Sequence, residues 1–260
     1  MRLLTKLLKI RILFSLVKNK SAILVDFLVS KKFLSSRDIQ INTSGNLVAV
    51  CRAGTSDLRE FAVVCGGLEY QARYFPIKQN PVIIDVGANI GSFVLYTSSV
   101  LAKYKPVVYG IEPSSENFTY LQKNIALNKL EVRARLFKMA ISEGMTSAIL
   151  DETDANDAFR LTHSSGFIGK GEHVQVLSLS AFFTLAGIHY ADLVKIDVEG
   201  EEFRIFTNEL DFIKKHISRM FVEVHELNSE CTLGSFTSML VDNRIQFTKF
   251  LNSNVLFLTF

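Results

Sequence analysis

The sequence predicts an α/β protein with a mostly parallel sheet and helices on both faces. From Pro81 onward, short segments rich in valine and isoleucine alternate with segments of helical character, which is the pattern of right-handed βαβ units. The strand segments are apolar nearly throughout, as expected for strands that are covered on both faces. The 260 residues are 48% hydrophobic and 21% charged, so the chain is long enough to bury a large core and too apolar to be disordered.

The first 80 residues are predicted to form an extension that precedes the domain at 81–260. Residues 1–40 have apolar side chains at helical spacing and no proline. Residues 47–52 and 61–65 have the composition of short strands. The extension is therefore expected to be helical first and to contain β-structure after it.

The elements of the domain follow one another in a regular order. We expect strands at the short apolar segments 82–88, 107–113, 132–141, 174–179, 192–200, 219–226, 245–250 and 254–260. We expect helices at 91–103, 115–128, 180–186 and 231–241, with one or two helices between 201 and 215. Residues 142–173 are rich in turn-forming residues and are expected to be irregular or a β-hairpin. The last two strands are expected to form a hairpin around Asn252–Asn254.

Ionisable side chains collect where the predicted strands end. In open parallel sheets, ligands bind beyond the carboxyl ends of the strands. The residues at these positions are Asp85, Glu112, Asp197, Glu199, Glu223 and His225. A functional site is therefore expected along this edge of the sheet.

The segment after the first of these strands contains Gly87, Asn89 and Gly91. The glycines let the chain turn tightly and let a ligand approach bare backbone, and the following helix directs its partial positive end at that ligand. Glu112 lies 21 residues after Gly91, at the end of the next strand, where an acid can accept hydrogen bonds from both hydroxyls of a ribose. These residues together predict a cofactor that contains a nucleoside.

Two features separate the candidates for this cofactor. The spacing G-x-N-x-G differs from the G-x-G-x-x-G fingerprint of dinucleotide sites. Asp85, two residues before Gly87, would repel a pyrophosphate but suits the cationic amino group of S-adenosylmethionine, which has no phosphate. A glycine and asparagine turn with a chance acid beside it is the alternative.

Five segments carry a resemblance to a known family. They are RAGTSDLREF at 52–61, DVGANIGSF at 85–93, GIEPSSENFTYLQKN at 110–124, LVKIDVEGEEFRIF at 193–206 and FVEVHE at 221–226. Over roughly residues 50–226 the chain resembles the FkbM-type family of S-adenosylmethionine-dependent methyltransferases. Two positions depart from the family pattern, because Ala53 replaces a usual proline and Ser180 stands where an aspartate is common.

The resemblance implies a class I methyltransferase fold, which is Rossmann-like with a mostly parallel seven-stranded sheet. It implies methyl transfer to a hydroxyl oxygen of a glycan, a glycolipid or another small natural product. It also implies that Asp85, Gly87, Asn89 and Gly91 line the cofactor and that Glu112 holds its ribose.

The chemical end of the site is expected at two strand ends. Lys195, Asp197 and Glu199 alternate along one strand and share a face, and Glu223 and His225 do so on another. If the strands are neighbours, we expect His225 to take the acceptor proton as a neutral imidazole, with Asp197 and Glu199 as catalytic partners. Asp197 is also expected to contact the cofactor. In the alternative interpretation, Lys195 pairs with Asp197, Glu199 caps the next helix and His225 is structural.

Metal and nucleic-acid sites are not expected. Asp197, Glu199, Glu223 and His225 include ligand types that suit a divalent ion, but their spacing does not demand one. The D/N-P-P-Y pattern of exocyclic-amine methylation is absent, which argues against a DNA N-methyltransferase. The basic cluster within 123–138 is modest, so it is interpreted as a solvated face.

Residues 1–20 hold six basic residues and no acidic one, which leaves a net charge of −3 on the remainder. This segment either packs onto the domain as a helix or lies on an anionic membrane surface. Neither a cleaved signal peptide nor a transmembrane helix is predicted. The three cysteines form no CxxC pair, which indicates free thiols in a reducing compartment. We expect a cytoplasmic protein, with peripheral membrane contact through residues 1–20 as the open alternative.

Two further functions were weighed against methyl transfer to a small-molecule or glycan acceptor. A nicotinamide-dependent oxidoreductase is disfavoured by Asp85 and by the glycine spacing. A non-catalytic, membrane-associated binding protein of the same fold is disfavoured by the acids at both strand ends.

Overall fold

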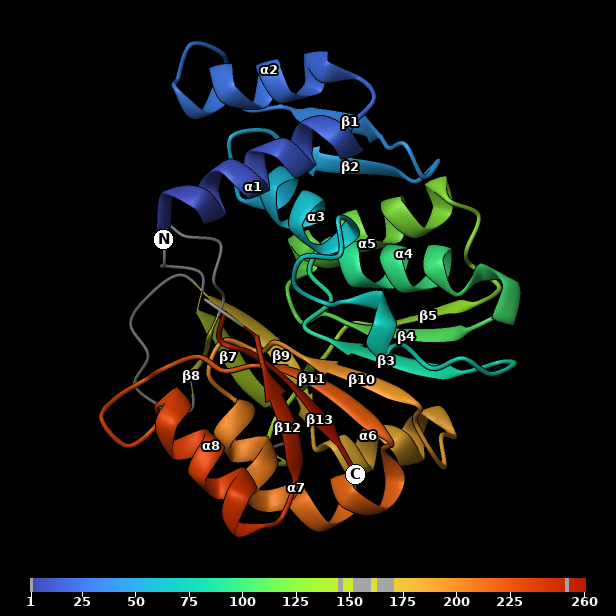
Figure 1. The fold of residues 1–260 in the computed structure, drawn as a ribbon, viewed down its shortest axis with the longest axis vertical. Helices are drawn as coiled ribbons and strands as arrows, with labels where there is room; N and C mark the ends of the chain where they lie inside the picture. The colour runs from blue at the N-terminus through green and yellow to red at the C-terminus, as the bar shows by residue number, and fades with distance from the viewer. Residues whose placement is uncertain (1, 145–146, 152–159, 163–170, 251–252) are drawn as a thin grey trace.

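The structure is a computed structural model that describes residues 2–144, 147–151, 160–162, 171–250 and 253–260 (Figure 1). Its main sheet has seven strands in the order β12-β13-β11-β10-β3-β4-β5. Their bounds are β3 (Val82–Val86), β4 (Val107–Ile111), β5 (Ala134–Phe137), β10 (Leu193–Ile196), β11 (Arg219–Glu223), β12 (Gln246–Lys249) and β13 (Val255–Thr259). The strands from β5 to β11 are parallel, whereas β13 is antiparallel to both of its neighbours. The predicted mostly parallel seven-stranded sheet and its terminal hairpin are confirmed, while part of the predicted hairpin turn lies outside the described residues.

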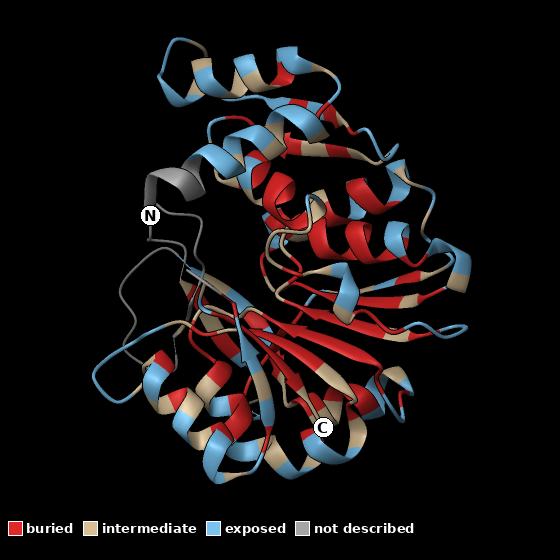
Figure 2. Ribbon diagram, in the orientation of Figure 1, coloured by how far each residue is buried: buried red, intermediate tan, exposed pale blue. Residues whose placement is uncertain are grey.

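Helices cover both faces of this sheet (Figure 1). They are α4 (Ser92–Val100), η2 (Ala102–Tyr104) and α5 (Ser115–Leu127) on one face, and α6 (Leu179–Ala186), α7 (Glu202–His216) and α8 (Leu233–Asp242) on the other. Side chains alternate along each strand, so Ile83 joins the core under α4 and Ile84 joins the core over α6 and α7. The strands are accordingly buried (Figure 2), and the ligand site is confined to the ends of the strands.

The first 80 residues pack on the α4 and α5 face. They comprise α1 (Arg2–Leu16), α2 (Lys20–Ser30), β1 (Asp38–Asn42), β2 (Val48–Arg52), α3 (Asp57–Cys65) and η1 (Ala72–Tyr74). β1 and β2 form a separate antiparallel pair. Buried side chains from Val17 to Phe75 belong to the same hydrophobic cluster as α4 and α5. The extension is thus anchored through a shared core, and the boundary near residue 80 stays a prediction.

One predicted strand of the extension is wrong, because residues 61–65 are the second half of α3. Asp57 and Glu60 occupy its first turn, which favours a helix start, and Gly66 follows its last residue. The helix packs against both α1 and α4, so an apolar segment is buried there without needing a strand.

The predicted strand at 132–141 is divided between two sheets. β5 ends at Phe137, which pairs with Ile111. Because Ile111 is the last residue of β4, the residues after Phe137 have no strand partner in the main sheet. Ala140–Ile141 instead forms β6 in a second sheet of order β6-β9-β7-β8. The other strands of this sheet are β7 (Ser147–Asp151), β8 (Arg160–Thr162) and β9 (Gly171–Leu177). Apart from the bend at 142–144, the described parts of the 142–173 excursion are therefore β-structure.

Candidate active site

A pocket opens at the carboxyl ends of β3, β4 and β10. It spans about 620 Å³ of space that is partly open to solvent. Its polar lining comes from Gly87, Asn89, Glu112, Asp197 and Glu199. Apolar side chains of the second sheet, including Leu150 and Leu161, close one wall. The pocket therefore contains most of the residues that the sequence assigned to a cofactor.

Glycine is required in this turn for a steric reason that the sequence did not suggest. Gly87 has φ +79°, and a Cβ at this position would lie 1.8 Å from the carbonyl oxygen of Asp197. The bare backbone of Gly87 thus accommodates the neighbouring strand end rather than leaving open space for a ligand. Gly91 has φ +93° and precedes α4, and a Cβ there would lie 2.7 Å from Leu121 Cδ1. Asn89 adopts φ 49° between the two glycines, a conformation that asparagine tolerates better than most residues.

Glu112 is held by the backbone of this turn. Its Oε2 accepts a hydrogen bond from the Asn89 N–H at 2.8 Å, and its Oε1 accepts one from the Ser114 N–H at 3.0 Å. Burial raises the pKa of Glu112 to about 7, although these hydrogen bonds oppose the shift. The carboxyl group lines the pocket at 4% exposure, so its orientation is fixed where a ribose would meet it.

Asp85 lies deeper than expected, in a buried ion pair with Lys195. Lys195 Nζ is 3.1 Å from Asp85 Oδ1 and 3.3 Å from Asp197 Oδ2, and it donates to the Gly87 carbonyl oxygen at 2.7 Å. Burial raises the pKa of Asp85 to about 6. Asp85 is not among the residues that line the pocket, so its direct contact with a cofactor stays a prediction. In the structure Asp85 pairs with Lys195, and Lys195 in turn contacts Asp197 and the carbonyl oxygen of Gly87.

His225 joins the two strand ends as the alternation argument predicted, because β10 and β11 are parallel neighbours. Its Nε2 is 3.4 Å from Glu199 Oε2 and 3.8 Å from Asp197 Oδ1. Its Nδ1 is 2.9 Å from Oε1 of Glu202, which is fully buried. Ligand atoms of Asp197, Glu199 and His225 all lie within 4.8 Å of one another. Glu223, expected in the same group, instead borders a different cavity.

The charges around His225 change its expected chemistry. Burial would lower its pKa, but the hydrogen bond to Glu202 and the charges of Asp197 and Glu199 outweigh burial and raise it to about 10. The imidazole therefore carries a proton at neutral pH. A neutral His225 acting as the base, as the sequence suggested, is not the form that this environment favours.

Sequence reasoning missed Glu202. Its Oε1 also accepts from the backbone N–H groups of Val198 and Gly200, so it stabilises the turn after β10, a role we had considered for Glu199. Glu199 itself adopts φ 53°, which aims its side chain at His225. One feature of the sequence could have indicated this role: Glu202 is the second of two adjacent acids at the start of an amphipathic helix.

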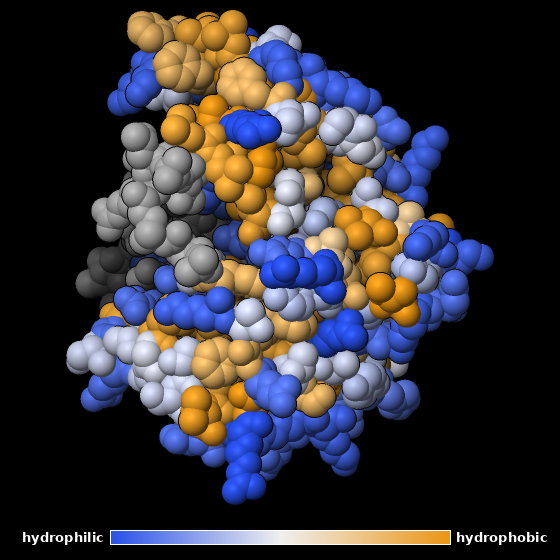
Figure 3. All heavy atoms as spheres, in the orientation of Figure 1, coloured by the Kyte–Doolittle hydropathy of each residue, from blue (hydrophilic) through white to orange (hydrophobic). Residues whose placement is uncertain are grey.

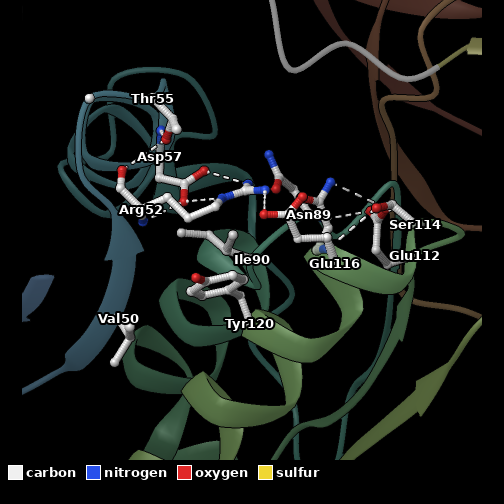
Figure 4. A network of polar contacts seen from close by, with 12 residues as sticks. Val50, Arg52, Thr55, Asp57, Asn89, Ile90, Glu112, Ser114, Glu116 and Tyr120 are labelled. Atoms are coloured by element: carbon white, nitrogen blue, oxygen red, sulfur yellow. Dashed lines mark hydrogen bonds and ion pairs between the residues drawn. The ribbon is translucent and has the colours of Figure 1, made fainter. Parts of the chain in front are cut away.

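The segment at 52–61 reaches the cofactor turn through a polar network (Figure 4). Asp57 pairs with the Arg52 guanidinium through both carboxylate oxygens, at 2.9 and 2.8 Å. Arg52 also lies 3.3 Å from Glu116 and stacks over the Tyr120 ring of α5. Figure 4 shows Asn89 and Glu112 beside this network. The extension thus supports the loop that forms the pocket.

Ser180, at the position where an aspartate was anticipated, does not cap its helix. Ser178 is the N-cap of α6 and accepts from the Ala181 N–H at 3.2 Å. Ser180 instead donates its hydroxyl and its backbone N–H to the carboxylate of Glu209. This places Ser180 in a contact between α6 and α7, away from the pocket.

Comparison with known proteins gives one family and several relatives. Residues 85–247 match the family described as the methyltransferase FkbM domain. The 31-O-demethyl-FK506 methyltransferase FkbM of Streptomyces tacrolimicus is 26% identical over 191 residues, covering 63% of this chain and 72% of that protein.

Solved structures also share similarity with the chain. The methyltransferase FkbM of Methylobacillus flagellatus KT has a TM-score of 0.49 and 14% identity, covering 74% of this chain but 46% of that one. The N-terminal domain of human METTL16, solved in complex with SAH, has a TM-score of 0.39 and 15% identity, covering 70% of this chain and 62% of that one.

Proposed function

The chain belongs to the FkbM-type family of S-adenosylmethionine-dependent methyltransferases, and from this premise we propose that it methylates a hydroxyl oxygen of a glycan, a glycolipid or another small natural product. The name of its Streptomyces relative describes a methyltransferase acting on 31-O-demethyl-FK506, which supports an oxygen acceptor. The family also argues against the nicotinamide-dependent alternative and the non-catalytic one.

One observation carries the proposal. Asp197 and Glu199 line the cofactor pocket and also lie 3.8 and 3.4 Å from His225 Nε2. The same two carboxylates therefore border the expected cofactor and a charged cluster that can handle a proton. Methyl transfer to an alcohol needs a methyl donor and a group that accepts a proton, because a hydroxyl group is a poor nucleophile until its proton is removed.

The pocket residues fit S-adenosylmethionine, which supplies an electrophilic methyl group when bound. We assign the ribose to Glu112, whose carboxyl group is fixed on the pocket wall, and the loop at Gly87–Gly91 to the positioning of the cofactor. We assign Asp85 an indirect role through Lys195, because its contacts lead there.

We propose that the cluster of His225, Glu199 and Asp197 takes the acceptor proton as a unit. The protonated imidazole, fixed through Nδ1 by Glu202, attracts the two neighbouring carboxylates and holds them in place. A carboxylate of the pair then accepts the proton, and His225 positions it. Lys195 stays protonated, because burial, which would lower its pKa, is outweighed by Asp85 and Asp197.

We propose a cytoplasmic location with peripheral membrane contact through residues 1–20. The three cysteines, Cys51, Cys65 and Cys231, are free thiols, which is usual in a reducing compartment. None of the described helices has the length and apolar run needed to cross a bilayer. The basic charge of residues 1–20 supports attraction to an anionic surface.

Labelled cofactor tests this function directly. The full chain is incubated with methyl-labelled S-adenosylmethionine and a cell extract of glycans and lipids, and mass spectrometry locates the label. We expect a product that gains one methyl group on oxygen, and none with the Asp197→Asn variant. Binding of NAD together with absence of any labelled product would contradict the proposal.

A further inference from the structure

A second cavity lies between the N-terminal helix and the end of the main sheet. It encloses about 1520 Å³ of space that is open to solvent. Four segments distant in the sequence form its walls, namely α1, residues 63–73, the end of β11 and the β12–β13 hairpin. This size exceeds that of the cofactor pocket and leaves room for a larger ligand.

Tyr70 and Glu223 connect this cavity to the active site. The Tyr70 hydroxyl donates to Glu223 Oε2 at 3.4 Å, and the Tyr70 ring lies 5.9 Å from Lys195 Nζ. Lys195 contacts Asp197, which borders the cofactor pocket. Tyr70, Lys195 and Asp197 therefore connect the cavity to the cofactor pocket, and an acceptor hydroxyl must extend past these side chains to within about 3–3.5 Å of the methyl group.

The carboxyl groups of the cavity suit hydroxyl groups. Burial raises the pKa of Glu223 to about 9, and the charge of Asp197 adds to the shift. Burial likewise raises the pKa of Glu69, which also lines the cavity, to about 7. Glu69 and Glu223 both line the cavity, so it offers carboxyl groups that can hydrogen-bond the hydroxyl groups of a ligand.

Positive charge surrounds these carboxyl groups. Lys9, Arg73 and Lys249 line the same cavity. Residues 1–37 contain nine basic residues and one acidic residue, a net charge of +8, while the rest of the chain carries −5. Three cations beside the carboxyl groups favour a hydroxylated ligand that also bears negative charge.

The helices beside the cavity leave apolar side chains in solvent. Leu7, Ile10 and Phe14 are 54%, 52% and 50% exposed on one face of α1, and Leu24 and Phe27 are 58% and 53% exposed on α2. We call these five residues the N-terminal face. Figure 3 shows apolar side chains gathered over α1 and α2 at the top of the view. An apolar face with basic residues around it is typical of a helix that lies in a membrane interface.

The opposite side of α1 is fixed to the protein. Ile12 lies so close to Gly66 that a Cβ on the glycine would be 2.4 Å from Ile12 Cγ2. Leu13 and Leu16 pack against the core, and Val17 is fully buried. The two interpretations of the N-terminal segment are therefore compatible, because α1 packs with one face and presents the other.

We propose, resting on the methyltransferase function above, that the second cavity binds the acceptor and that this acceptor is a hydroxylated, anionic head group of a membrane lipid. The N-terminal face docks on the anionic bilayer. Leu8 and Lys9 of α1 line the cavity, so the helix that docks on the bilayer also forms one wall of the cavity.

Vesicle flotation tests the docking step with the full chain. We expect binding to vesicles of phosphatidylcholine with phosphatidylglycerol, little binding to phosphatidylcholine alone, and release in high salt because screening weakens exposed charges. The Ile10→Asp/Phe14→Asp variant is expected to bind at least roughly tenfold less. Val132→Asp is the matched control, because Val132 is 94% exposed outside the N-terminal face. Equal flotation of all three proteins would overturn the docking proposal.

Transfer of label tests the acceptor class. Wild type is given methyl-labelled cofactor with a lipid extract in anionic vesicles, or with the water-soluble extract of the same cells. We expect label in the lipid fraction, and at least roughly tenfold less with Arg73→Glu/Lys249→Glu, since two cations become anions. Calorimetry with S-adenosylhomocysteine is expected to give wild-type affinity for this variant and for Ile10→Asp/Phe14→Asp.

The outcomes separate this inference from the proposed function. Label that enters only water-soluble acceptors, at a rate unaffected by the cavity variant, would overturn the inference and leave the methyltransferase function intact. Failure of wild type to bind S-adenosylhomocysteine would instead refute the proposed function itself.

Discussion

The cofactor pocket and the second cavity are connected through Asp197, Lys195 and Tyr70 but are built differently. The polar side of the pocket is formed by the ends of adjacent parallel strands and by the short turns that follow them. The second cavity is formed by segments from both ends of the chain. Local motifs therefore specify the pocket, whereas only the tertiary fold creates the cavity.

The buried carboxyl groups of the two regions show the same difference. Glu112 accepts hydrogen bonds from backbone N–H groups of its own turn and its neighbour, so the pocket presents one fixed geometry. Burial raises the pKa of both Glu69 and Glu223; the charge of Asp197 adds to both shifts, and Glu69 adds to that of Glu223. The cofactor pocket, with its carboxyl group fixed by backbone hydrogen bonds, therefore suits one cofactor. The second cavity, whose carboxyl groups can change their protonation, can adapt to an acceptor.

A single methyl group added to the glycine turn would break the fixed geometry of the pocket. Gly87→Ala places Cβ 1.8 Å from the Asp197 carbonyl oxygen, so the strand ends must separate. Gly187→Ala is the matched control, because Gly187 also has positive φ but has no atom within 4 Å of the added Cβ. We expect Gly87→Ala to lower turnover by at least about 100-fold, since displacements of about 1 Å have that effect.

Two measurements decide this prediction. Thermal unfolding is expected to show a loss of about 1–2 kcal/mol for Gly187→Ala, the usual strain of a left-handed residue, and more for Gly87→Ala. Cofactor affinity is expected to fall in Gly87→Ala alone. Similar behaviour of the two variants would mean that backbone strain, and not the contact with Asp197, makes Gly87 necessary.

Removal of the imidazole tests the chemistry on the boundary between the two regions. His225→Ala is expected to lower turnover by about 100-fold or more, the scale of losing a proton-handling group, while leaving cofactor affinity almost unchanged. Asp197→Asn is expected to lower both, because Asp197 borders the pocket and contacts Lys195. His189→Ala is the control, since His189 is exposed and contacts His216 through its backbone oxygen.

The acceptor must be present for this comparison to be valid. Turnover is measured with the identified acceptor, and affinity by calorimetry with S-adenosylhomocysteine. A wild-type rate in His225→Ala would remove the imidazole from the mechanism. A rate restored by added magnesium or manganese would instead assign Asp197, Glu199 and His225 to a metal.

The contrast also explains what the sequence could predict. The parallel sheet, the glycine turn and the acids at strand ends were readable because each depends on residues that are close in sequence. β1 was missed although Ile39 and Ile41 alternate as in a strand, because it follows a long helical segment. Residues 61–65 were misassigned because burial between two helices overrides strand propensity.

Site residues show the same limit. Asp197 and His225 were placed at neighbouring strand ends from alternation alone. The buried position of Asp85, the hydrogen bond from Glu202 to His225 and the raised pKa of His225 could not be predicted, because each depends on side chains from different elements. The second cavity could not be predicted either, since its lining comes from distant segments and has no motif.

Loss of the ribose acceptor is expected to have a smaller effect than loss of chemistry. Glu112→Ala removes two charge-assisted hydrogen bonds, each worth on the order of 1.5–3 kcal/mol, so affinity for S-adenosylhomocysteine should fall by at least roughly tenfold. Glu131→Ala is the control, because Glu131 is exposed. Unchanged affinity in Glu112→Ala would exclude Glu112 from the cofactor site.

The pH dependence of cofactor binding is the smallest expected effect and the one most specific to the fixed pocket. Burial raises the pKa of Glu112 to about 7, and the ionised carboxylate is the form that accepts hydrogen bonds from both ribose hydroxyls. As pH falls through 7 the carboxylate gains a proton, so affinity for S-adenosylhomocysteine should weaken by roughly fivefold between about pH 8 and pH 6. Glu112→Gln is neutral throughout this range and should lose the dependence. A pH profile that is the same in wild type and Glu112→Gln would assign the titration to another group, of which Asp85, with its pKa raised to about 6, is the first to test.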